Sequence, residues 1–134
     1  MRILFVCAHN RFRSKVAEKL FEFYDLSGRN EIKSAGVQID LMKQYVSDSV
    51  YDVMAERGLK IGDEQARQLD EELIEWADKI VLVANNVNTK IFPKEKLEVW
   101  KIPDAPEEDF RRIRQIVNKI EEHVQDFVRR INSQ

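Results

Sequence analysis

The sequence predicts an α/β fold: a single-domain three-layer sandwich in which helices cover both faces of a four-stranded parallel sheet. Three observations favour this class. Segments typical of strands alternate with segments typical of helices, which is the order that builds parallel sheets. The strand-like segments include continuous apolar runs, as expected of strands covered on both faces. The length of 134 residues fits one compact domain, which we expect to span residues 1–134.

The first strand is expected over residues 2–7, where the run Arg-Ile-Leu-Phe-Val-Cys is apolar after its first residue. A polar loop follows, and a helix is predicted over 14–26 with one apolar face. The residues of that face are Ala17, Leu20, Phe21 and Tyr24. A turn at Ser27 and Gly28 ends the helix, and a short second strand is predicted over 31–35.

The middle of the chain predicts helices separated by polar loops. Residues 37–44 lack a clear pattern and are expected to form a loop, whereas 46–57 carry helical periodicity and end at Gly58, a typical C-terminal cap. Asp70 is expected to cap the start of a further helix, because its short carboxylate can accept a bond from a free N–H of the first turn.

The last third predicts two strands and a long helix. Residues 79–83 are apolar after the first residue and predict another buried strand, and a fourth strand is predicted over 98–102. Apolar residues then recur at alternating steps of three and four, which predicts one amphipathic helix over 107–131. These positions are Phe110, Ile113, Val117, Ile120, Val124, Phe127 and Ile131. Acidic residues fill its expected first turn, where the positive end of the helix dipole favours them.

The composition excludes several classes of partner. With 22 basic and 24 acidic side chains, the chain has no overall positive field of the kind that attracts nucleic acid. No apolar run is long enough to cross a bilayer, and residues 3–8 are too few for the core of a signal peptide. The one cysteine excludes an internal disulfide. We therefore expect a cytoplasmic protein in a reducing compartment, without nucleic-acid or membrane partners.

The residues most suited to chemistry follow the first strand, in Cys7-Ala8-His9-Asn10-Arg11-Phe12-Arg13-Ser14. Cys7 ends a strand, and parallel sheets bind ligands at the carboxyl ends of strands. A loop that leads into a helix can direct several backbone N–H groups at one anion, and the helix N-terminus adds positive potential. Such a field favours the thiolate, which is the nucleophilic form of cysteine. The segment therefore predicts an oxyanion-binding nucleophile.

Other side chains of this segment fit the same chemistry. Arg13 has a planar guanidinium that can grip two oxygens of a tetrahedral oxyanion. Asn10 tolerates a left-handed backbone, which a tight loop without glycine requires. The Ser14 hydroxyl can hydrogen-bond the thiolate. Simpler interpretations are a buried apolar role for Cys7 and an N-cap role for Ser14, but the joint occurrence of strand, cysteine, Arg-Ser and helix favours catalysis.

Several segments carry a resemblance to a known family. They are Ile3-Leu4-Phe5-Val6-Cys7 with Asn10, Arg13-Ser14 and Ala17-Glu18, then Ser34-Ala35-Gly36, Ala66-Arg67-Gln68-Leu69, Trp76-Ala77-Asp78-Lys79-Ile80, and Trp100 to Asp104 before the final helix. In these residues the sequence resembles the low-molecular-weight protein tyrosine phosphatases and the related arsenate reductases. The resemblance covers nearly the whole chain in family order.

The resemblance implies a cysteine-dependent phosphatase that uses neither metal nor cofactor. It implies that Cys7 attacks phosphorus to form a phosphocysteine, that Arg13 holds the transferring group, and that Asp104 is the general acid. The remaining loop residues would bind the phosphate. They are Ala8, His9, Asn10, Arg11, Phe12 and Ser14. The expected substrate is a phosphorylated protein or a small phosphomonoester, and the expected state is a monomer or weak dimer.

The loop departs from the common phosphatase pattern at three positions. His9 replaces the usual glycine and is more familiar from the arsenate reductases, and Phe12 stands where many members have a second cysteine. Arg11 occupies a position that is normally uncharged. We favour a solvated side chain at the rim for Arg11, over a role in attracting an anionic substrate.

The segment around Asp104 also departs from the family. Ala105 separates Asp104 from Pro106, whereas the family has Asp-Pro, so an ordinary turn before the helix is an alternative role for Asp104. Glu108 and Asp109 are fallback acids, although both fall inside the predicted helix. The aromatic residues that line a phosphotyrosine slot are missing after Asp104, which leaves phosphotyrosine, phosphoarginine and small phosphate esters all open as substrates.

Two other functions stay open at this point. One is arsenate reduction, because arsenate has the shape of phosphate; without further cysteines the chain would need an external thiol. The other is a non-catalytic domain that binds an oxyanion or a protein partner. Retention of both Cys7 and Arg13 favours an enzyme over such a binding domain.

Overall fold

The computed structural model describes residues 1–133 as four strands and the helices between them. The strands are β1 (Arg2–Cys7), β2 (Glu31–Gly36), β3 (Lys79–Val83) and β4 (Leu97–Trp100). The helices are α1 (Arg13–Tyr24), α2 (Asp48–Glu56), α3 (Glu71–Trp76), the short 3-10 helix η1 (Thr89–Ile91) and α4 (Phe110–Asn132). Strands and helices alternate as the sequence predicts.

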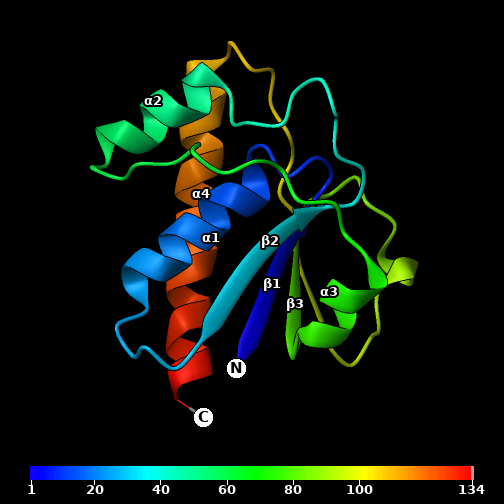
Figure 1. The fold of residues 1–134 in the computed structure, drawn as a ribbon. Helices are drawn as coiled ribbons and strands as arrows, with labels where there is room; N and C mark the ends of the chain where they lie inside the picture. The colour runs from blue at the N-terminus through cyan, green and yellow to red at the C-terminus, as the bar shows by residue number, and fades with distance from the viewer. Residues whose placement is uncertain (134) are drawn as a thin grey trace.

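The four strands form one parallel sheet in the order β2-β1-β3-β4. Figure 1 shows α1, α2 and α4 on one side of this sheet and α3 on the other. The predicted three-layer architecture with helices on both faces is confirmed. The central strand β1 is buried along Ile3–Cys7, which explains its continuous apolar run.

Alternate residues of the strands pack into two separate hydrophobic cores, one on each face of the sheet. Ile3 and Phe5 point toward α1, α2 and α4, whereas Leu4 and Val6 point toward α3. The larger core contains a cluster of aromatic rings whose centroids lie 5.7–6.2 Å apart. The cluster consists of Phe5, Phe21, Trp100 and Phe127. Trp100, the last residue of β4, therefore packs in the core.

The final helix begins later than its charge pattern predicts. Asp109 caps α4 by accepting a hydrogen bond from the Arg112 N–H at 3.0 Å, so Glu107 and Glu108 lie before the helix and Asp109 at its boundary. Phe110 is the first helical residue and is exposed, unlike the later apolar residues of the helix such as Ile113 and Val117. The helix predicted from residue 46 likewise starts only after Ser47, whose hydroxyl accepts from the Val50 N–H.

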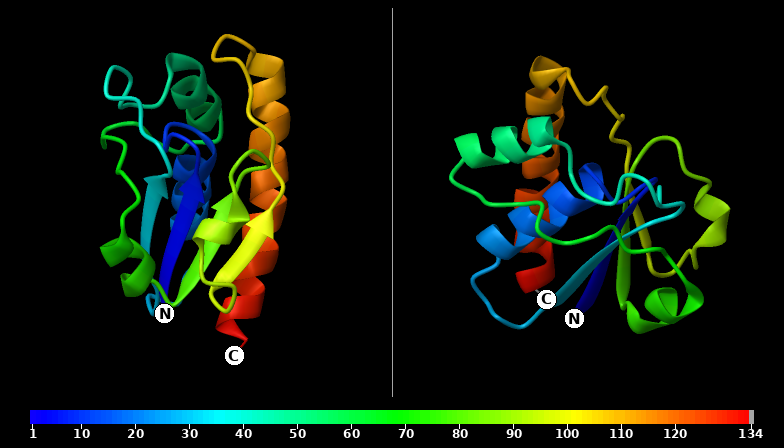
Figure 2. Two further views of the ribbon diagram at one scale, coloured as in Figure 1. Left: turned by 90° about the vertical axis from the view of Figure 1, so that its right-hand side faces the viewer. Right: turned by 45° about the horizontal axis from the view of Figure 1, so that its top comes forward.

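Both chain ends lie at one end of the sheet, opposite the loops that follow the strands (Figure 2). The loop after β1 and the irregular segment 101–109 meet at that opposite end, with residues from both lining one pocket. The site is therefore built at the carboxyl edge of the sheet, where parallel sheets hold their ligands.

Among residues 1–133, no helix combines the length and apolar character needed to span a membrane.

Candidate active site

A pocket of about 220 Å³ lies at the carboxyl edge of the sheet. Three parts of the chain contribute its walls: the loop after β1, the start of α2, and the segment from Asp104 to the first turns of α4. The lining residues are Cys7, His9, Arg11, Phe12, Arg13, Ser47, Val50, Asp104, Ala105, Glu107 and Ile113. Six of the nine residues predicted for the site thus line one pocket.

The loop that carries Cys7 turns sharply above β2. Asn10 has a φ of 57°, the left-handed conformation that its residue type predicts. The loop also passes so close to Gly36 that a Cβ at this glycine would lie 2.7 Å from the His9 carbonyl carbon and 2.8 Å from the Asn10 nitrogen. The glycine that ends β2 therefore makes room for the loop.

A chain of buried hydrogen bonds supports the loop from below. Cys7 Sγ lies 3.0 Å from Ser14 Oγ, and the Asn10 side-chain amide donates to both Ser14 Oγ (2.7 Å) and Ser34 Oγ (3.0 Å). Because Ser14 Oγ accepts from Asn10, its own hydrogen is free to point at the sulfur. Ser14 lies inside α1 and is not its N-cap, so its alternative role as a cap is wrong.

The network continues into α1 and the next loop. Ser34 Oγ donates to Glu18 Oε1 at 2.6 Å, and Asn10 Oδ1 accepts from the Arg67 N–H at 2.9 Å. Burial raises the pKa of Glu18 above its ordinary value, although the bond from Ser34 acts in the opposite direction. Asn10 is fully buried, and its amide hydrogens and carbonyl all have partners, so it joins three segments that are distant in sequence.

The backbone of the loop leaves donors free for a ligand. In the part of the chain described by the structure, the N–H groups of residues 9–13 donate to no protein acceptor. They precede and begin α1, whose N-terminus adds positive potential at the same place. An oxyanion bound at this end of α1 can satisfy these groups, which is the arrangement that the sequence predicts for this loop.

Arg13 joins this loop to the segment that carries Asp104. Its guanidinium is buried and donates to the Ile102 carbonyl (2.8 Å) and to Asn86 Oδ1 (3.2 Å) through Nη1. Nη2 lies 3.7 Å from Asp104 Oδ2, and Nε has no hydrogen-bond partner among the described residues. The Nε and Nη2 edge of Arg13 is therefore available to two oxygens of a ligand.

Arg11 is not the solvated rim residue that we expected. Its Nε donates to the Tyr45 carbonyl at 2.8 Å, and its Nη1 pairs with the carboxylate of Glu107. Only 19% of the Arg11 side chain is exposed. Arg11 holds the pKa of Glu107 below its usual range, so this carboxylate stays ionised near neutral pH.

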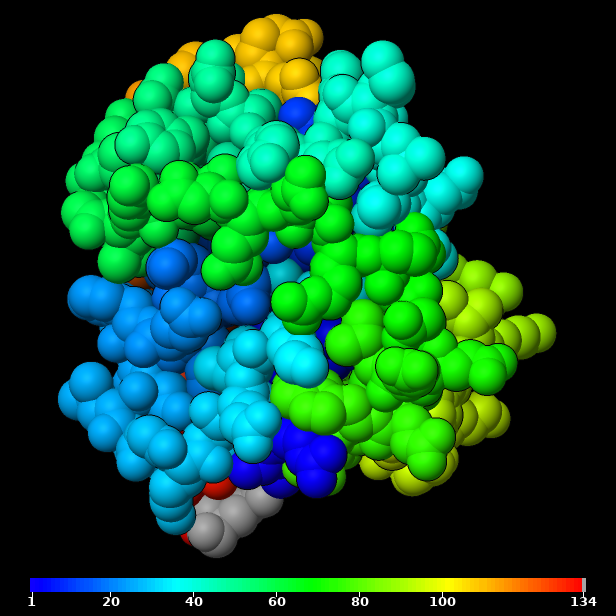
Figure 3. Space-filling view, viewed as in Figure 1, coloured from blue at the N-terminus to red at the C-terminus, as the bar shows by residue number. Residues whose placement is uncertain are grey.

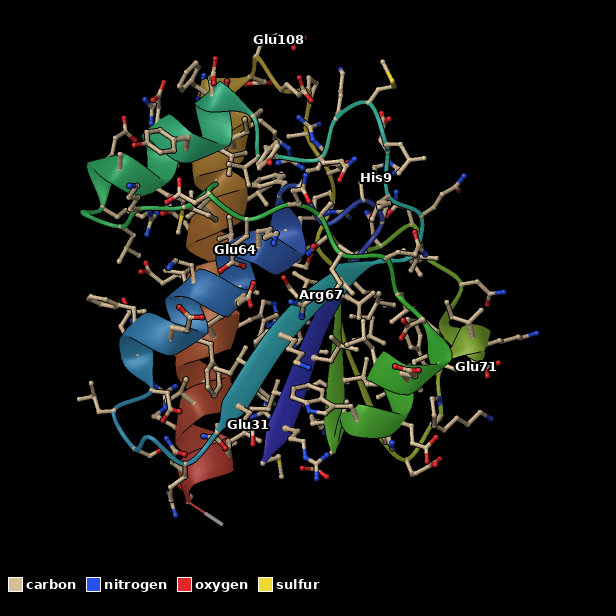
Figure 4. All side chains as sticks on the ribbon, viewed as in Figure 1. His9, Glu31, Glu64, Arg67, Glu71 and Glu108 are labelled. Atoms are coloured by element: carbon tan, nitrogen blue, oxygen red, sulfur yellow. The ribbon has the colours of Figure 1, made fainter. Side chains whose placement is uncertain are left out.

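The remaining predicted residues divide between the pocket and its support. His9 lines the pocket, and its Nδ1 lies 2.7 Å from the Gln38 carbonyl. Because a carbonyl only accepts, Nδ1 carries the hydrogen, and Nε2 has no partner among residues 1–133. Figure 4 shows His9 at the end of the sheet where the strands finish, far from Glu31 at the start of β2. Phe12 lines the pocket, whereas Ala8 only accepts a bond from the Gln38 N–H.

Sequence reasoning missed several residues of the site. Glu107 falls in the first turn of the predicted helix but lines the pocket, and Ser47 and Val50 enter it from the start of α2. Ser34 and Gly36 lie below the loop, in a segment whose only signal in the sequence is the family resemblance.

Among residues 1–133, no group of three or more His, Cys, Asp or Glu side chains could hold a metal ion.

The chain is similar to known arsenate reductases and to an arginine phosphatase. An arsenate reductase from Archaeoglobus fulgidus has 35% identity and a TM-score of 0.78, with 94% of this chain and 98% of that one covered. The YwlE arginine phosphatase from Geobacillus stearothermophilus has 26% identity and a TM-score of 0.84, covering 98% and 93% of the two chains. A putative arsenate reductase from Halobacterium salinarum is 26% identical over 96% of this chain and 91% of its own.

The family comparison covers nearly all of the sequence. The model of the family described as "Low molecular weight phosphotyrosine protein phosphatase" matches residues 2–134. This match confirms the family suggested by the loop after β1, and with it the prediction of an enzyme of the phosphatase type. Since the match spans the pocket, the sheet and the last helix together, the chain belongs to the low molecular weight phosphotyrosine protein phosphatase family.

Proposed function

We propose that the chain is a phosphomonoester phosphatase that works through a phosphocysteine on Cys7. The observation that supports this most is the meeting of a thiol, a guanidinium and a carboxylate in one pocket, on Cys7, Arg13 and Asp104. The free N–H groups of residues 9–13 add donors for the equatorial oxygens of a transferring phosphoryl group. The pocket thus holds a nucleophile for phosphorus, donors for the equatorial oxygens and an acid for the leaving oxygen.

In the first step the Cys7 thiolate attacks phosphorus, and the bond from phosphorus to the leaving oxygen breaks. The proton of Asp104 passes to that oxygen, so the alcohol leaves neutral. Arg13 and the loop N–H groups hold the three other oxygens while their charge grows. Ser14 stabilises the sulfur as a thiolate, because its hydrogen is free to point at Cys7 Sγ.

In the second step water attacks phosphorus on the side that the alcohol has left. Asp104, now a carboxylate, takes a proton from the water, and the bond between sulfur and phosphorus breaks. Inorganic phosphate leaves, and Cys7 returns to the thiolate. We assign His9, Arg11 and Phe12 to the walls of the substrate pocket, and Ala8, Asn10 and Ser14 to the support of the loop.

The test is hydrolysis of an aryl phosphate by the purified protein without reductant, compared with its Cys7→Ser variant. We expect the variant to lose turnover by at least about 10⁴-fold while it still binds vanadate, because the cradle is unchanged and only the nucleophile is weaker. Since Cys7 is the only cysteine, iodoacetate labels a single site, and phosphate should protect it. Unchanged turnover in Cys7→Ser would remove the proposal. Vanadate binding by a parent protein that hydrolyses no phosphomonoester would instead identify a binding domain.

Arsenate reduction is the second candidate, favoured by the 35% identity to the Archaeoglobus fulgidus enzyme. Cys7 would attack arsenic with loss of water, and an external thiol would then attack the Cys7 sulfur. That attack releases arsenite, in which arsenic has gained two electrons, and leaves a mixed disulfide that a second thiol reduces. The thiols must be external because the chain has no second cysteine. Arsenate-dependent oxidation of glutathione without any phosphate hydrolysis would favour this candidate.

The physiological substrate belongs to the same proposal. We infer a phosphorylated protein or a small phosphomonoester, and a panel of phosphotyrosine and phosphoarginine peptides and alkyl phosphates separates these classes. The two carboxylates in the pocket, Asp104 and Glu107, are suited to a leaving group that carries N–H donors.

We further propose a single domain over residues 1–134 and a monomer or weak dimer. We also propose a cytoplasmic location, because the nucleophile must stay reduced.

A further inference from the structure

We propose that Arg11 and Glu107 form a positioning clamp that holds Asp104 against the leaving group. Asp104 lies in the segment 101–109, which has no helix or strand of its own. Its side chain is about half exposed, with an exposed fraction of 48%, and within the described residues its carboxylate has two polar partners, the Ala105 N–H (2.8 Å) and Arg13 Nη2 (3.7 Å). A carboxylate that must deliver a proton accurately therefore needs order from elsewhere. The inference rests on the proposed function, in which Asp104 is the general acid.

Two arginines of the phosphate loop hold this segment on either side of Asp104. On one side, Arg13 donates to the carbonyl of Ile102, two residues before the acid. On the other side, Arg11 pairs with the carboxylate of Glu107, three residues after it. The acid is thereby attached twice to the loop that carries the nucleophile.

The clamp is itself anchored to a third segment. The Nε of Arg11 donates to the Tyr45 carbonyl, which fixes the guanidinium between the loop before α2 and the segment 101–109. Lys43 Nζ lies 3.9 Å from the same carboxylate oxygen of Glu107 that Arg11 contacts. Figure 3 shows blue atoms of the N-terminal part of the chain between residues coloured cyan to teal and the orange residues before α4.

The engagement of Arg11 argues against a role in attracting the phosphate. Its guanidinium already faces an ionised carboxylate and a carbonyl oxygen, so little of its charge is left unpaired. Arg13 by contrast keeps its Nε and Nη2 edge available to the ligand. The two arginines therefore have different tasks: Arg13 contacts the phosphoryl group, and Arg11 positions the acid.

A double-mutant cycle tests the clamp. We compare the parent with Arg11→Met, Glu107→Gln and the double variant, measuring kcat and KM on p-nitrophenyl phosphate and on an alkyl phosphate. The nitrophenolate leaves without a proton, whereas the alkoxide needs one. We expect each single variant to lose about 10- to 100-fold in kcat/KM on the alkyl phosphate, the scale of a misplacement near 1 Å, and to lose little kcat/KM on p-nitrophenyl phosphate. The selectivity is read from kcat/KM because it reports the first step alone, whereas the second step, in which Asp104 acts as base, is common to both substrates. The double variant should lose no more than either single variant, because both remove the same contact.

Controls separate positioning from general damage. Glu56 and Arg114 form an exposed bidentate pair between α2 and α4, outside the pocket, and Glu56→Gln should leave the ratio of the two rates unchanged. Arg11→Lys keeps a charge near Glu107 but loses the fork that also reaches Tyr45, so it should restore part of the alkyl phosphate rate. A merely structural role would lower both rates together and would show no such rescue.

The outcomes also separate this inference from the proposed function. If Asp104→Asn loses the alkyl phosphate selectively but the Arg11 and Glu107 variants lose both substrates equally or neither, the clamp is wrong and the phosphatase stands. If Asp104→Asn shows no selectivity, Asp104 is not the acid and the clamp has nothing to position. Retained turnover in Cys7→Ser would reject the phosphatase itself.

Discussion

The phosphate loop and the segment that carries Asp104 face each other across one pocket, but they are held in different ways. In the loop, Cys7, Asn10, Arg13 and Ser14 are each at most 2% exposed, and side-chain hydrogen bonds join them to one another and to their surroundings. In residues 101–109 only Ile102 is fully buried. The loop thus has internal order, whereas the acid segment takes its order from contacts with the loop.

Because of this difference, mutations in the two regions should change the activity on different substrates in different ways. Damage to the loop alters the nucleophile and the oxyanion cradle, so every substrate should suffer alike. Damage to the acid segment alters proton delivery to the leaving group, so in kcat/KM, which reports the first step, only substrates with poor leaving groups should suffer. The ratio of activity on alkyl and aryl phosphates therefore reports which of the two regions has been disturbed.

Asp104→Asn should give the largest selective effect. Asparagine keeps the size of the side chain but cannot supply the proton, so hydrolysis of an alkyl phosphate should fall by about 10²–10⁴-fold. Measured as kcat/KM, which reports only the first step, the rate on p-nitrophenyl phosphate should fall far less, because its leaving group needs no proton. Steady-state kinetics on both substrates measures the ratio.

The matched control for this variant is Glu108→Gln, four residues further along. Glu108 is exposed and is absent from the pocket lining, so its amide variant should leave both rates unchanged. A selective loss in Glu108→Gln together with an unaffected Asp104→Asn would transfer the role of acid to Glu108. The contrast between the phosphate loop and the acid segment would still hold, with Glu108 as the general acid in place of Asp104.

The same contrast explains what could be predicted from sequence. The loop was predictable because its parts are consecutive: a buried strand, a cysteine at its end, a residue that tolerates positive φ, and a helix that starts at once. Asn10 has the predicted left-handed φ of 57°, and the predicted sheet and its two covered faces are confirmed. These features depend on local periodicity and backbone preference, which sequence records directly.

The acid segment was less predictable because its contacts are long-range. Arg11 and Glu107 are 96 residues apart, and nothing in the local pattern of either residue reveals the pair. Glu107 instead resembles a residue of the first helical turn, because acidic residues are common there. The cap at Asp109 moves the start of α4 and releases Glu107 toward the pocket. A one-turn difference at a helix end therefore hid a residue of the site.

Gly36→Ala should have a smaller effect, of the kind that belongs to the loop. The new Cβ would lie 2.7 Å from the His9 carbonyl carbon, and because the crowded atoms belong to the backbone, they cannot turn aside as the end of a flexible side chain could. We expect a loss of about 1–3 kcal/mol in the free energy of unfolding, the usual cost of overpacking. Both aryl and alkyl phosphate rates should fall by the same factor. Urea unfolding and kinetics on both substrates check this.

Gly28→Ala is the control for Gly36→Ala. Gly28 has a φ of 68°, but a Cβ added there would meet no atom within 4 Å, so its variant carries the cost of backbone strain without a clash. It should lose some stability and keep the parent kcat on both substrates. A Gly36→Ala protein with normal kcat would mean that the loop can shift without harm to the cradle, which would weaken the claim that the loop is rigid.

Glu18→Gln should have the smallest effect and concerns the end of the loop network beyond Ser34. Burial raises the pKa of Glu18 in the folded protein above the ordinary value of 4.5. Between these two values the folded state binds more protons than the unfolded state, so stability falls as pH rises through that window. Glutamine cannot ionise but can still accept from Ser34. The free energy of unfolding of the parent, measured relative to Glu18→Gln, should therefore be most favourable below pH 4.5 and decline as pH rises above it.

The pH dependence of Glu18→Gln can be isolated with Glu22→Gln, an exposed carboxylate one turn further along α1. This variant removes an exposed carboxylate together with its ion pair to Lys19, so the pH profile of Glu18→Gln relative to that of Glu22→Gln reports the contribution of the buried site. An opposite slope for Glu18→Gln would mean that Lys15 and Ser34 favour the carboxylate more strongly than burial opposes it. In that case the network below Cys7 would hold an ionised carboxylate, and the loop would owe part of its order to charge, as the acid segment does through Arg11 and Glu107.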